Sequence, residues 1–152
     1  MKINKIIIAG YELSGQGGME TVCSTLVRLL RARHPGVDIS FVFFKEGNAT
    51  VCDDWLAHSN YSRITSGIKN TKIRRLSFAN SFRKLISREK PEIIIALDTL
   101  SCFISNVARQ YTLQKPVIFS WLHFSTHNLY KAKYVQCADY HLSICSAITE
   151  QL

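Results

Sequence analysis

The sequence predicts an α/β protein with a doubly wound, mostly parallel sheet of the Rossmann-like kind. Apolar runs of strand length alternate with segments whose apolar residues recur at helical spacing. In most of these runs the apolar residues follow one another instead of alternating with polar ones, which is typical of strands that helices cover on both faces. The 152 residues match the usual length of one domain, so we expect residues 1–152 to form a single Rossmann-like domain.

The first half of the chain contains three predicted strands and one predicted helix. Residues 3–9 end in the apolar run 6–9, which stops at Gly10, and 37–44 is rich in β-branched and aromatic residues, so both are predicted strands. Between them, residues 19–33 carry apolar side chains at helical spacing, and a His-Pro-Gly sequence ends that helix. A weak third strand is predicted at 62–65.

The second half continues the alternation. Residues 77–89 have apolar side chains on one face and basic and hydroxyl side chains on the other, and Lys90-Pro91 ends that helix. The remaining predicted elements are strands at 92–97, 116–121 and 139–144, a helix at 100–111, and a helix that begins near Cys145. Ligands bind such sheets beyond the carboxyl ends of the strands, where the strand order reverses.

The positive charge is concentrated in one region. Residues 63–90 hold nine basic residues and one acidic residue, and this excess of eight equals the net charge of the whole chain, +8. A local excess of this kind predicts a surface that faces phosphate groups. The residues that we expect on this anion-facing surface are Arg75, Arg83, Lys84 and Arg88. Nucleic acid is not the expected partner, since aromatic residues are not interleaved on the basic face and no nucleic-acid-binding motif is present.

A glycine-rich loop precedes the first predicted helix. Gly15, Gly17 and Gly18 would bring backbone N–H groups and the positive end of the helix dipole toward an anion. The third glycine of a dinucleotide fingerprint is replaced by Glu20, and no Lys-Ser/Thr pair of a P-loop follows. Two interpretations stay open: a cradle for phosphate or sugar, and a flexible connector with a glycine cap. Glu20 either complements the helix dipole or positions a polar ligand.

Two further polar residues follow predicted strands directly. Asp98 comes after the strand at 92–97, where it either caps the next helix or contacts a ligand. His123 ends the strand near 116–121, where a neutral imidazole suits hydrogen bonding or base catalysis, or is structural. His127 follows four residues later, but no third ligand accompanies the pair, so no metal site is expected.

The cysteines and the apolar runs indicate a protein of the cytoplasm. Five cysteines form no C-x-x-C pair and are expected as reduced, mostly buried thiols. No apolar run approaches the roughly 18 residues of a membrane span.

Several stretches resemble one family. Residues 17–22 (GGMETV) look like the G-G-x-E loop of retaining glycosyltransferases with the two-domain GT-B fold, of the glycosyltransferase family 4 type. The stretches 94–98 (IIALD), 119–125 (FSWLHFS) and 137–144 (CADYHLSI) are similar, in order and spacing, to galactosyltransferases that build the lipopolysaccharide core.

This resemblance implies a function and a set of site residues. The chain would be the N-terminal, acceptor-binding half of an enzyme that transfers galactose from UDP-galactose to the lipopolysaccharide core, peripheral to the inner membrane and without a metal or other cofactor. Gly17 and Gly18 would approach the donor diphosphate, Glu20 would hold their loop, Asp98 would lie near the acceptor, and His123 would contact the transferred sugar as the catalytic residue.

The resemblance also implies a missing part. The C-terminal domain, which binds most of the UDP-sugar, would be absent from this chain, so we expect the 152 residues to be inactive alone. Three other functions compete with this one: a nucleotide-dependent oxidoreductase domain, a nucleic-acid binder, and a non-catalytic module for an anionic lipid or phosphate ligand.

Overall fold

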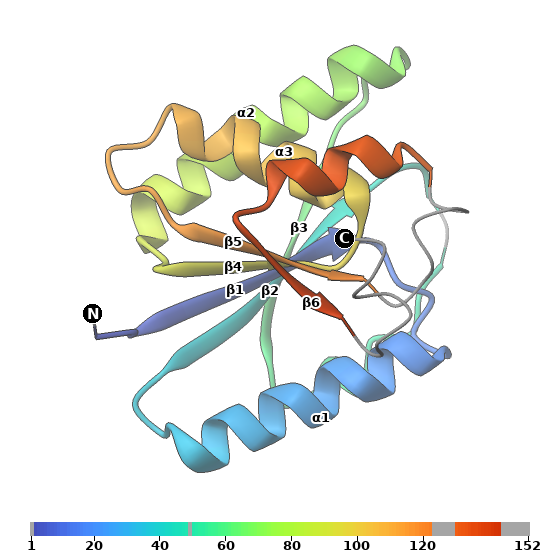
Figure 1. Cartoon of the computed structure of the whole chain (residues 1–152). Coiled ribbons are helices and arrows are strands. Elements are labelled where there is room, and N and C mark those ends of the chain that lie inside the picture. The colour runs from blue at the N-terminus through green and yellow to red at the C-terminus, as the bar shows by residue number, and fades with distance from the viewer. Residues whose placement is uncertain (1, 49, 123–129, 144–152) are drawn as a thin grey trace.

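The sheet of the protein is parallel, as predicted. The computed structural model describes residues 2–48, 50–122 and 130–143. Its six strands lie in the order β3-β2-β1-β4-β5-β6, and each neighbouring pair is parallel. The strands are β1 (Lys5–Tyr11), β2 (Asp38–Lys45), β3 (Asn60–Thr65), β4 (Ile93–Ala96), β5 (Val117–Leu122) and β6 (Tyr140–Ser143). The doubly wound, Rossmann-like fold class is therefore confirmed (Figure 1).

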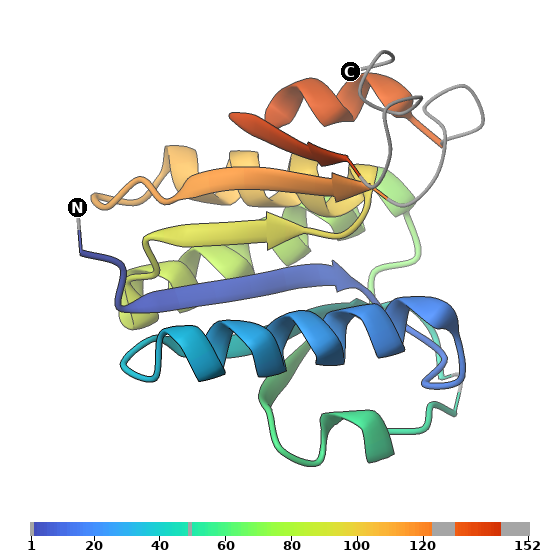
Figure 2. The same ribbon diagram turned by 60° about the horizontal axis from the view of Figure 1, so that its bottom comes forward.

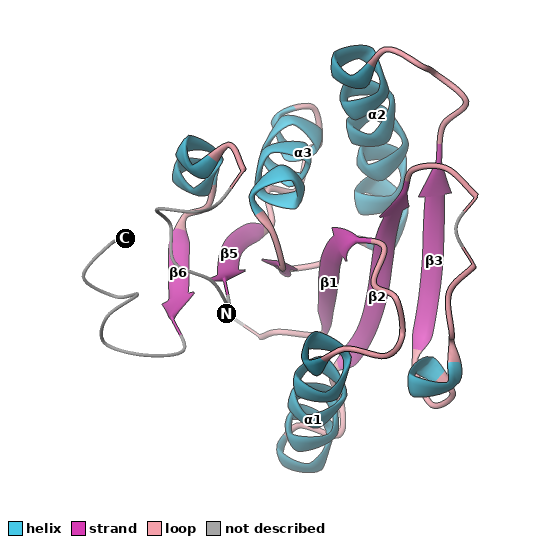
Figure 3. Cartoon of the chain, turned by 90° about the vertical axis from the view of Figure 1, so that its right-hand side faces the viewer, coloured by secondary structure: helices cyan, strands magenta, loops and turns pink. Residues whose placement is uncertain are grey.

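Helices cover both faces of this sheet. Helix α1 (Gly18–Arg33) lies on one face, and α2 (Thr71–Glu89) and α3 (Thr99–Gln110) lie on the other (Figure 3). Two short 3-10 helices complete the described elements, η1 (Asp54–Leu56) and η3 (Ala132–Cys137). The strand order reverses between β1 and β4, because α2 carries the chain from the edge strand β3 back to the other side of β1.

Continuous apolar strands supply the core on both faces. In β2, Phe41 and Phe43 stack with ring centroids 5.8 Å apart and belong to the cluster under α1. Phe44 belongs to the opposite cluster, where its ring meets that of Phe82 from α2 edge-on at 5.4 Å. Because successive side chains of a strand point to opposite faces, a strand buried on both sides reads as an unbroken apolar run.

Helix α2 begins six residues earlier than predicted. Asn70 caps it, since its side-chain oxygen accepts hydrogen bonds from the N–H groups of Lys72 (3.0 Å) and Ile73 (3.2 Å). The first turns carry exposed Ile73 and Leu76 beside exposed Lys72, so apolar residues there do not follow the buried stripe. The apolar pattern consequently underestimated the length of this helix.

The remaining general features agree with the sequence where they are described. Cys23, Cys52, Cys102 and Cys137 are free thiols, and burial raises the pKa of Cys23 to about 12. The helix expected near Cys145 lies outside the described residues. Among the helices that the structure describes, none is long and apolar enough to cross a membrane.

Candidate functional site

The candidate site lies at the carboxyl ends of β1 and β4, where the strand order reverses. Figure 2 shows β1, β4 and β5 ending on the same side of the molecule. A cavity of about 320 Å³ opens there. Its lining residues are Tyr11, Glu12, Leu13, Met19, Leu97, Asp98, Thr99, Leu100, Leu122 and Tyr130. Apolar and aromatic walls with a few carboxylates and hydroxyls are typical of small-molecule sites.

A larger hollow lies elsewhere and lacks this chemistry. It measures about 630 Å³ on the α1 side of the sheet, and its walls are almost entirely apolar, with Phe119 and Ile95 among them. Since a saccharide needs several hydrogen-bonding partners, the smaller cavity at the carboxyl edge is the better candidate for a sugar site.

Glu20 fixes the glycine loop at one side of the cavity. Its Oε1 accepts a hydrogen bond from the Gly15 N–H at 2.7 Å, and only 4% of the residue is exposed. Gly15 has φ +88°, and a Cβ there would lie 2.0 Å from the carbonyl oxygen of Cys52. Gly15 is therefore the most constrained glycine of the loop, which the sequence argument did not single out because nothing in the sequence predicts the contact with Cys52.

Gly17 and Gly18 form the start of α1. Gly17 is the N-cap residue in an extended conformation and supplies no side-chain cap. A Cβ on Gly18 would meet nothing within 4 Å, so open space lies beside it. Met19, the next residue, lines the cavity. The positive end of the helix dipole is thus close to the cavity, in the position that an anionic ligand favours.

Asp98 joins the ends of β1 and β4. One carboxylate oxygen accepts from the Ser101 N–H at 2.8 Å and the other from the Tyr11 N–H at 2.9 Å. The Ser101 hydroxyl accepts in turn from the Asp98 N–H, which completes a capping box on α3. Of the two interpretations left open by the sequence, the capping one is observed. Burial raises the pKa of the Asp98 carboxyl, while the N–H groups of Tyr11 and Ser101 act in the opposite direction.

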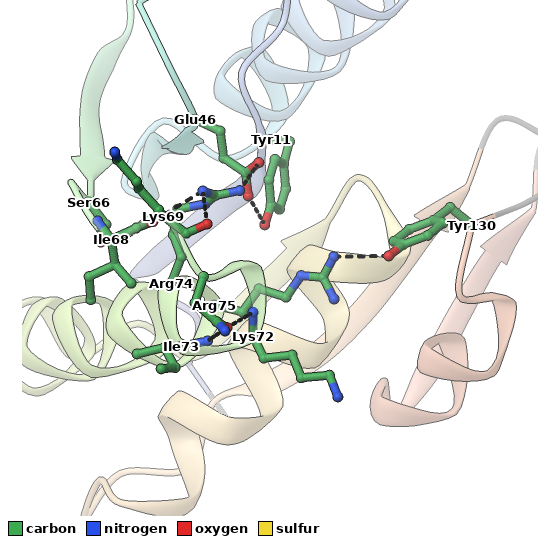
Figure 4. A network of polar contacts seen from close by, with 11 residues as sticks. Tyr11, Glu46, Ser66, Ile68, Lys69, Lys72, Ile73, Arg74, Arg75 and Tyr130 are labelled. Atoms are coloured by element: carbon green, nitrogen blue, oxygen red, sulfur yellow. Dashed lines mark hydrogen bonds and ion pairs between the residues drawn. The ribbon is translucent and has the colours of Figure 1, made fainter.

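One of the four residues predicted on the anion-facing surface is buried. Arg75 is a correction: only 8% of it is exposed, because the early start of α2 puts it on the buried stripe with Phe78 and Phe82. Its Nη2 donates to the Tyr130 hydroxyl at 3.2 Å (Figure 4).

Acidic residues pair with other arginines of this region. Arg63 pairs with Glu12 at 2.9 Å and Arg88 with Glu89 at 2.9 Å. Arg83 is partly buried and donates to the Asn80 side chain, and Lys84 is exposed.

The predicted catalytic histidine follows the last residue of β5 directly in the sequence. His123 and His127 lie outside the described residues, directly after Leu122, which ends β5 and lines the cavity. In the part of the chain that is described, no three His, Cys, Asp or Glu side chains gather in a way that would hold a metal ion.

Fold and cavity together define a Rossmann-like α/β domain with a ligand site at the switch point of its sheet. Solved structures share this fold. A putative UDP-N-acetylglucosamine 2-epimerase from Listeria monocytogenes has a TM-score of 0.71 at 17% identity, over 99% of this chain and 42% of that one. MurG from Acinetobacter baumannii has a TM-score of 0.66 at 10% identity, over 92% and 41%. These likenesses show the fold alone, and no protein-family model matches the chain.

Two curated proteins are more similar. The chain is 35% identical, over 97% of its length, to the lipopolysaccharide 1,6-galactosyltransferases of Salmonella typhimurium and Escherichia coli. The solved structure of the lipopolysaccharide outer core galactosyltransferase WaaB, in its apo form, has a TM-score of 0.92 at 35% identity over 97% of this chain. The resemblance to such galactosyltransferases is thus confirmed. The chain spans 41% and 40% of the length of the two curated relatives.

Proposed function

We propose that this chain supplies the acceptor-binding half of a hexosyltransferase that transfers galactose from UDP-galactose to the lipopolysaccharide core. The observation that carries the proposal is the 35% identity over 97% of the chain to lipopolysaccharide 1,6-galactosyltransferases. In the reaction, an acceptor hydroxyl forms a bond to the anomeric carbon of galactose, the bond from that carbon to UDP breaks, and the hydroxyl loses its proton.

The cavity at the carboxyl edge fits the acceptor side of this reaction. Its aromatic and apolar walls suit the faces of sugar rings, and its polar groups suit their hydroxyls. Gly17 and Gly18 turn the start of α1 toward the donor diphosphate, Glu20 holds their loop, and Asp98 holds the wall behind the acceptor. The catalytic role of His123 follows from the resemblance.

The donor sugar nucleotide is held mainly by a second domain in this proposal. Closure of the two domains over the cavity excludes water and aligns the acceptor hydroxyl with the anomeric carbon. No metal ion takes part, so transfer by a chain that contains both domains is expected to persist in EDTA. The 152 residues alone are expected to bind acceptor without transferring galactose.

Part of the surface of α2 fits an anionic membrane. Ile73 and Leu76 are each 54% exposed, and Lys69 and Lys72 beside them are exposed as well. Figure 4 shows Ile73, Lys69 and Lys72 at this end of the helix. Apolar side chains flanked by lysines enter the headgroup region of bilayers that contain acidic lipids. These four residues, here called the α2 surface, hold the enzyme at the inner membrane, close to its lipid-linked acceptor.

A titration tests the acceptor half of the proposal. The chain is titrated with lipopolysaccharide core oligosaccharide that lacks the galactose, and amide shifts are followed by NMR. Saturable shifts at Gly17, Asp98 and Tyr130 are expected. A response to NADH instead would favour an oxidoreductase domain, and binding to anionic vesicles without any response to the oligosaccharide would favour a non-catalytic lipid module.

A further inference from the structure

Arg75 is a buried cation without a carboxylate partner among the described residues. Only 8% of it is exposed, and none of the seven ion pairs in the described chain includes it. Its Nε is buried and makes no hydrogen bond there. The sequence outside the described residues contains one further acidic side chain, Glu150. Arg75 donates to the hydroxyl of Tyr130, which lines the cavity. Because a buried charge is costly unless it is paired, a guanidinium in this position points to an anionic ligand.

The phenol of Tyr130 lies beside Arg75, and a second cation lies near the same ring. The Arg75 Cζ is 5.6 Å and the Lys131 Nζ 5.8 Å from the centroid of the Tyr130 ring. Tyr130 is 60% exposed and lines the cavity. The Thr99 hydroxyl donates to the Tyr130 carbonyl oxygen at 2.6 Å, which fixes this segment at the start of α3. Two cations therefore flank one phenol on the wall of the proposed acceptor site.

The neighbouring carboxylate does not neutralise this cluster. Glu46 accepts from the Tyr11 hydroxyl at 3.2 Å, and its other oxygen pairs with Arg74 at 2.7 Å (Figure 4). The charge of Glu46 is thus matched by Arg74, and no ion pair within the described ranges includes Arg75 or Lys131.

We propose that Arg75, Tyr130 and Lys131 form a subsite for a phosphate ester on the acceptor glycan. This proposal rests on the proposed function, and it assigns the chemical class of one acceptor substituent. A guanidinium presents its N–H groups in a fork that matches two oxygens of a phosphate. Nε and Nη2 of Arg75 are the two donors of such a fork, and the Tyr130 hydroxyl and the Lys131 ammonium are a third and a fourth donor. Two cations suit a dianionic phosphate monoester better than a carboxylate.

A purely structural role for Arg75 makes different predictions. In that case the guanidinium only packs against Tyr130, and its substitution changes stability without changing the response to phosphate. The experiment therefore follows binding at the Arg75 side chain itself, whose Nε–Hε signal is visible in ¹⁵N spectra of the 152-residue chain.

The ligands are the galactose-deficient core oligosaccharide, the same oligosaccharide after enzymatic dephosphorylation, and inorganic phosphate. We expect the phosphorylated glycan to move the Arg75 Nε–Hε signal in a saturable way and to bind at least tenfold more tightly than the dephosphorylated glycan. Arg75→Lys keeps the charge but loses the fork, and should weaken binding of the phosphorylated glycan about tenfold. Arg28→Lys, the same change at an exposed arginine of α1, should alter it less than twofold.

The outcomes separate this subsite from the proposed function. If both glycans bind equally and the Arg75 signal stays still, the subsite is wrong and the acceptor half-site stands. If neither glycan binds, both proposals fail. If inorganic phosphate moves the Arg75 signal as strongly as the phosphorylated glycan, the site is a free-phosphate site and the assignment to the acceptor is overturned. The wild-type signal decides the matter even if Arg75→Lys does not fold.

Discussion

Glu20 and Gly15 form the hydrogen bond that ties the glycine loop to the helix that follows it. The Gly15 N–H donates to Glu20 Oε1 at 2.7 Å. The carboxylate also lies close to Gly17, where an added Cβ would be 2.8 Å from Oε2. In a dinucleotide fingerprint the corresponding position is a glycine. Here the carboxylate occupies the inside of the loop, so the loop has a fixed shape before any ligand arrives.

Replacement of Glu20 should therefore destabilise the protein. Glu20→Ala leaves the Gly15 N–H without its partner in a partly buried position, and we expect a loss of about 1–3 kcal/mol in the free energy of unfolding. Glu20→Gln keeps an acceptor oxygen and should cost less than half as much. Urea denaturation of both variants measures the difference, and equal losses would show that the hydrogen bond is not the cause.

Alanine substitutions at the two ends of the glycine loop should change the stability of the protein in opposite directions. Gly15→Ala meets the Cys52 carbonyl at 2.0 Å with φ +88°, so we expect a loss of more than about 2 kcal/mol. In Gly18→Ala the added methyl group lies in open space at the start of α1, so this substitution should be neutral or stabilise the protein by up to about 1 kcal/mol. In a chain with both domains, Gly18→Ala should still lower galactose transfer, because the methyl group would stand where the diphosphate approaches. An unchanged rate would remove Gly18 from the site.

Substitution of Asp98 should lower the stability of the protein rather than act on catalysis directly. Asp98→Ala removes the cap of α3 and the acceptor of the Tyr11 N–H at once, and should cost about 2–3 kcal/mol. Asp98→Asn keeps one acceptor oxygen, so its cost should be roughly half of that. Thermal unfolding measures both changes. A stable Asp98→Ala protein with impaired acceptor binding would instead identify direct ligand contact.

The ion pair between Asp139 and Arg109 should make stability depend on pH. The Arg109 guanidinium lowers the pKa of the Asp139 carboxyl below its usual value. Since the folded pKa is lower than the unfolded value near 4, the contribution is present above about pH 4 and is lost as pH falls through the folded pKa. Asp139→Asn should cost about 1 kcal/mol at pH 7, because both partners are partly exposed.

The variant and the wild type should converge in acid. Urea denaturation at pH 7 and near pH 2.5 measures this convergence. The stability of Arg109→Gln should depend on pH in the same way as that of Asp139→Asn. A difference between wild type and Asp139→Asn that stays constant over this range would rule out the ion pair as its source.

The α2 surface should carry membrane binding. The pair Ile73→Ser and Leu76→Ser should lower binding to vesicles with acidic lipids at least fivefold, with less than about 0.5 kcal/mol lost in stability, because both side chains are exposed. Leu113→Ser, at a fully exposed leucine outside this surface, is the matched control and should bind like the wild type. Equal binding by all variants in a vesicle sedimentation assay would exclude the α2 surface.

The sequence alone determined the layers of this protein. Apolar runs of strand length such as 93–97 are typical of strands buried on both faces, and the stripe at 100–111 is typical of a helix that packs on such a sheet, so local patterns predicted the parallel fold. The same logic put the glycine loop and Asp98 at the carboxyl edge. The sequence also predicted helix capping as one of two roles of Asp98, because a cap involves only residues that are close in the sequence.

Tertiary structure decided what depends on residues far apart in the sequence. The sequence predicted Arg75 as a surface cation, but the early start of α2 places it on the buried stripe. There it contacts the hydroxyl of Tyr130, which is 55 positions away in the sequence. Gly15 is constrained by its φ of +88° and by Cys52, which the fold brings against it. The charge of Arg63 is paired with that of Glu12, which is 51 positions away in the sequence. Charge and spacing along a chain predict which groups exist, whereas pairing and burial depend on which distant groups the sheet brings together.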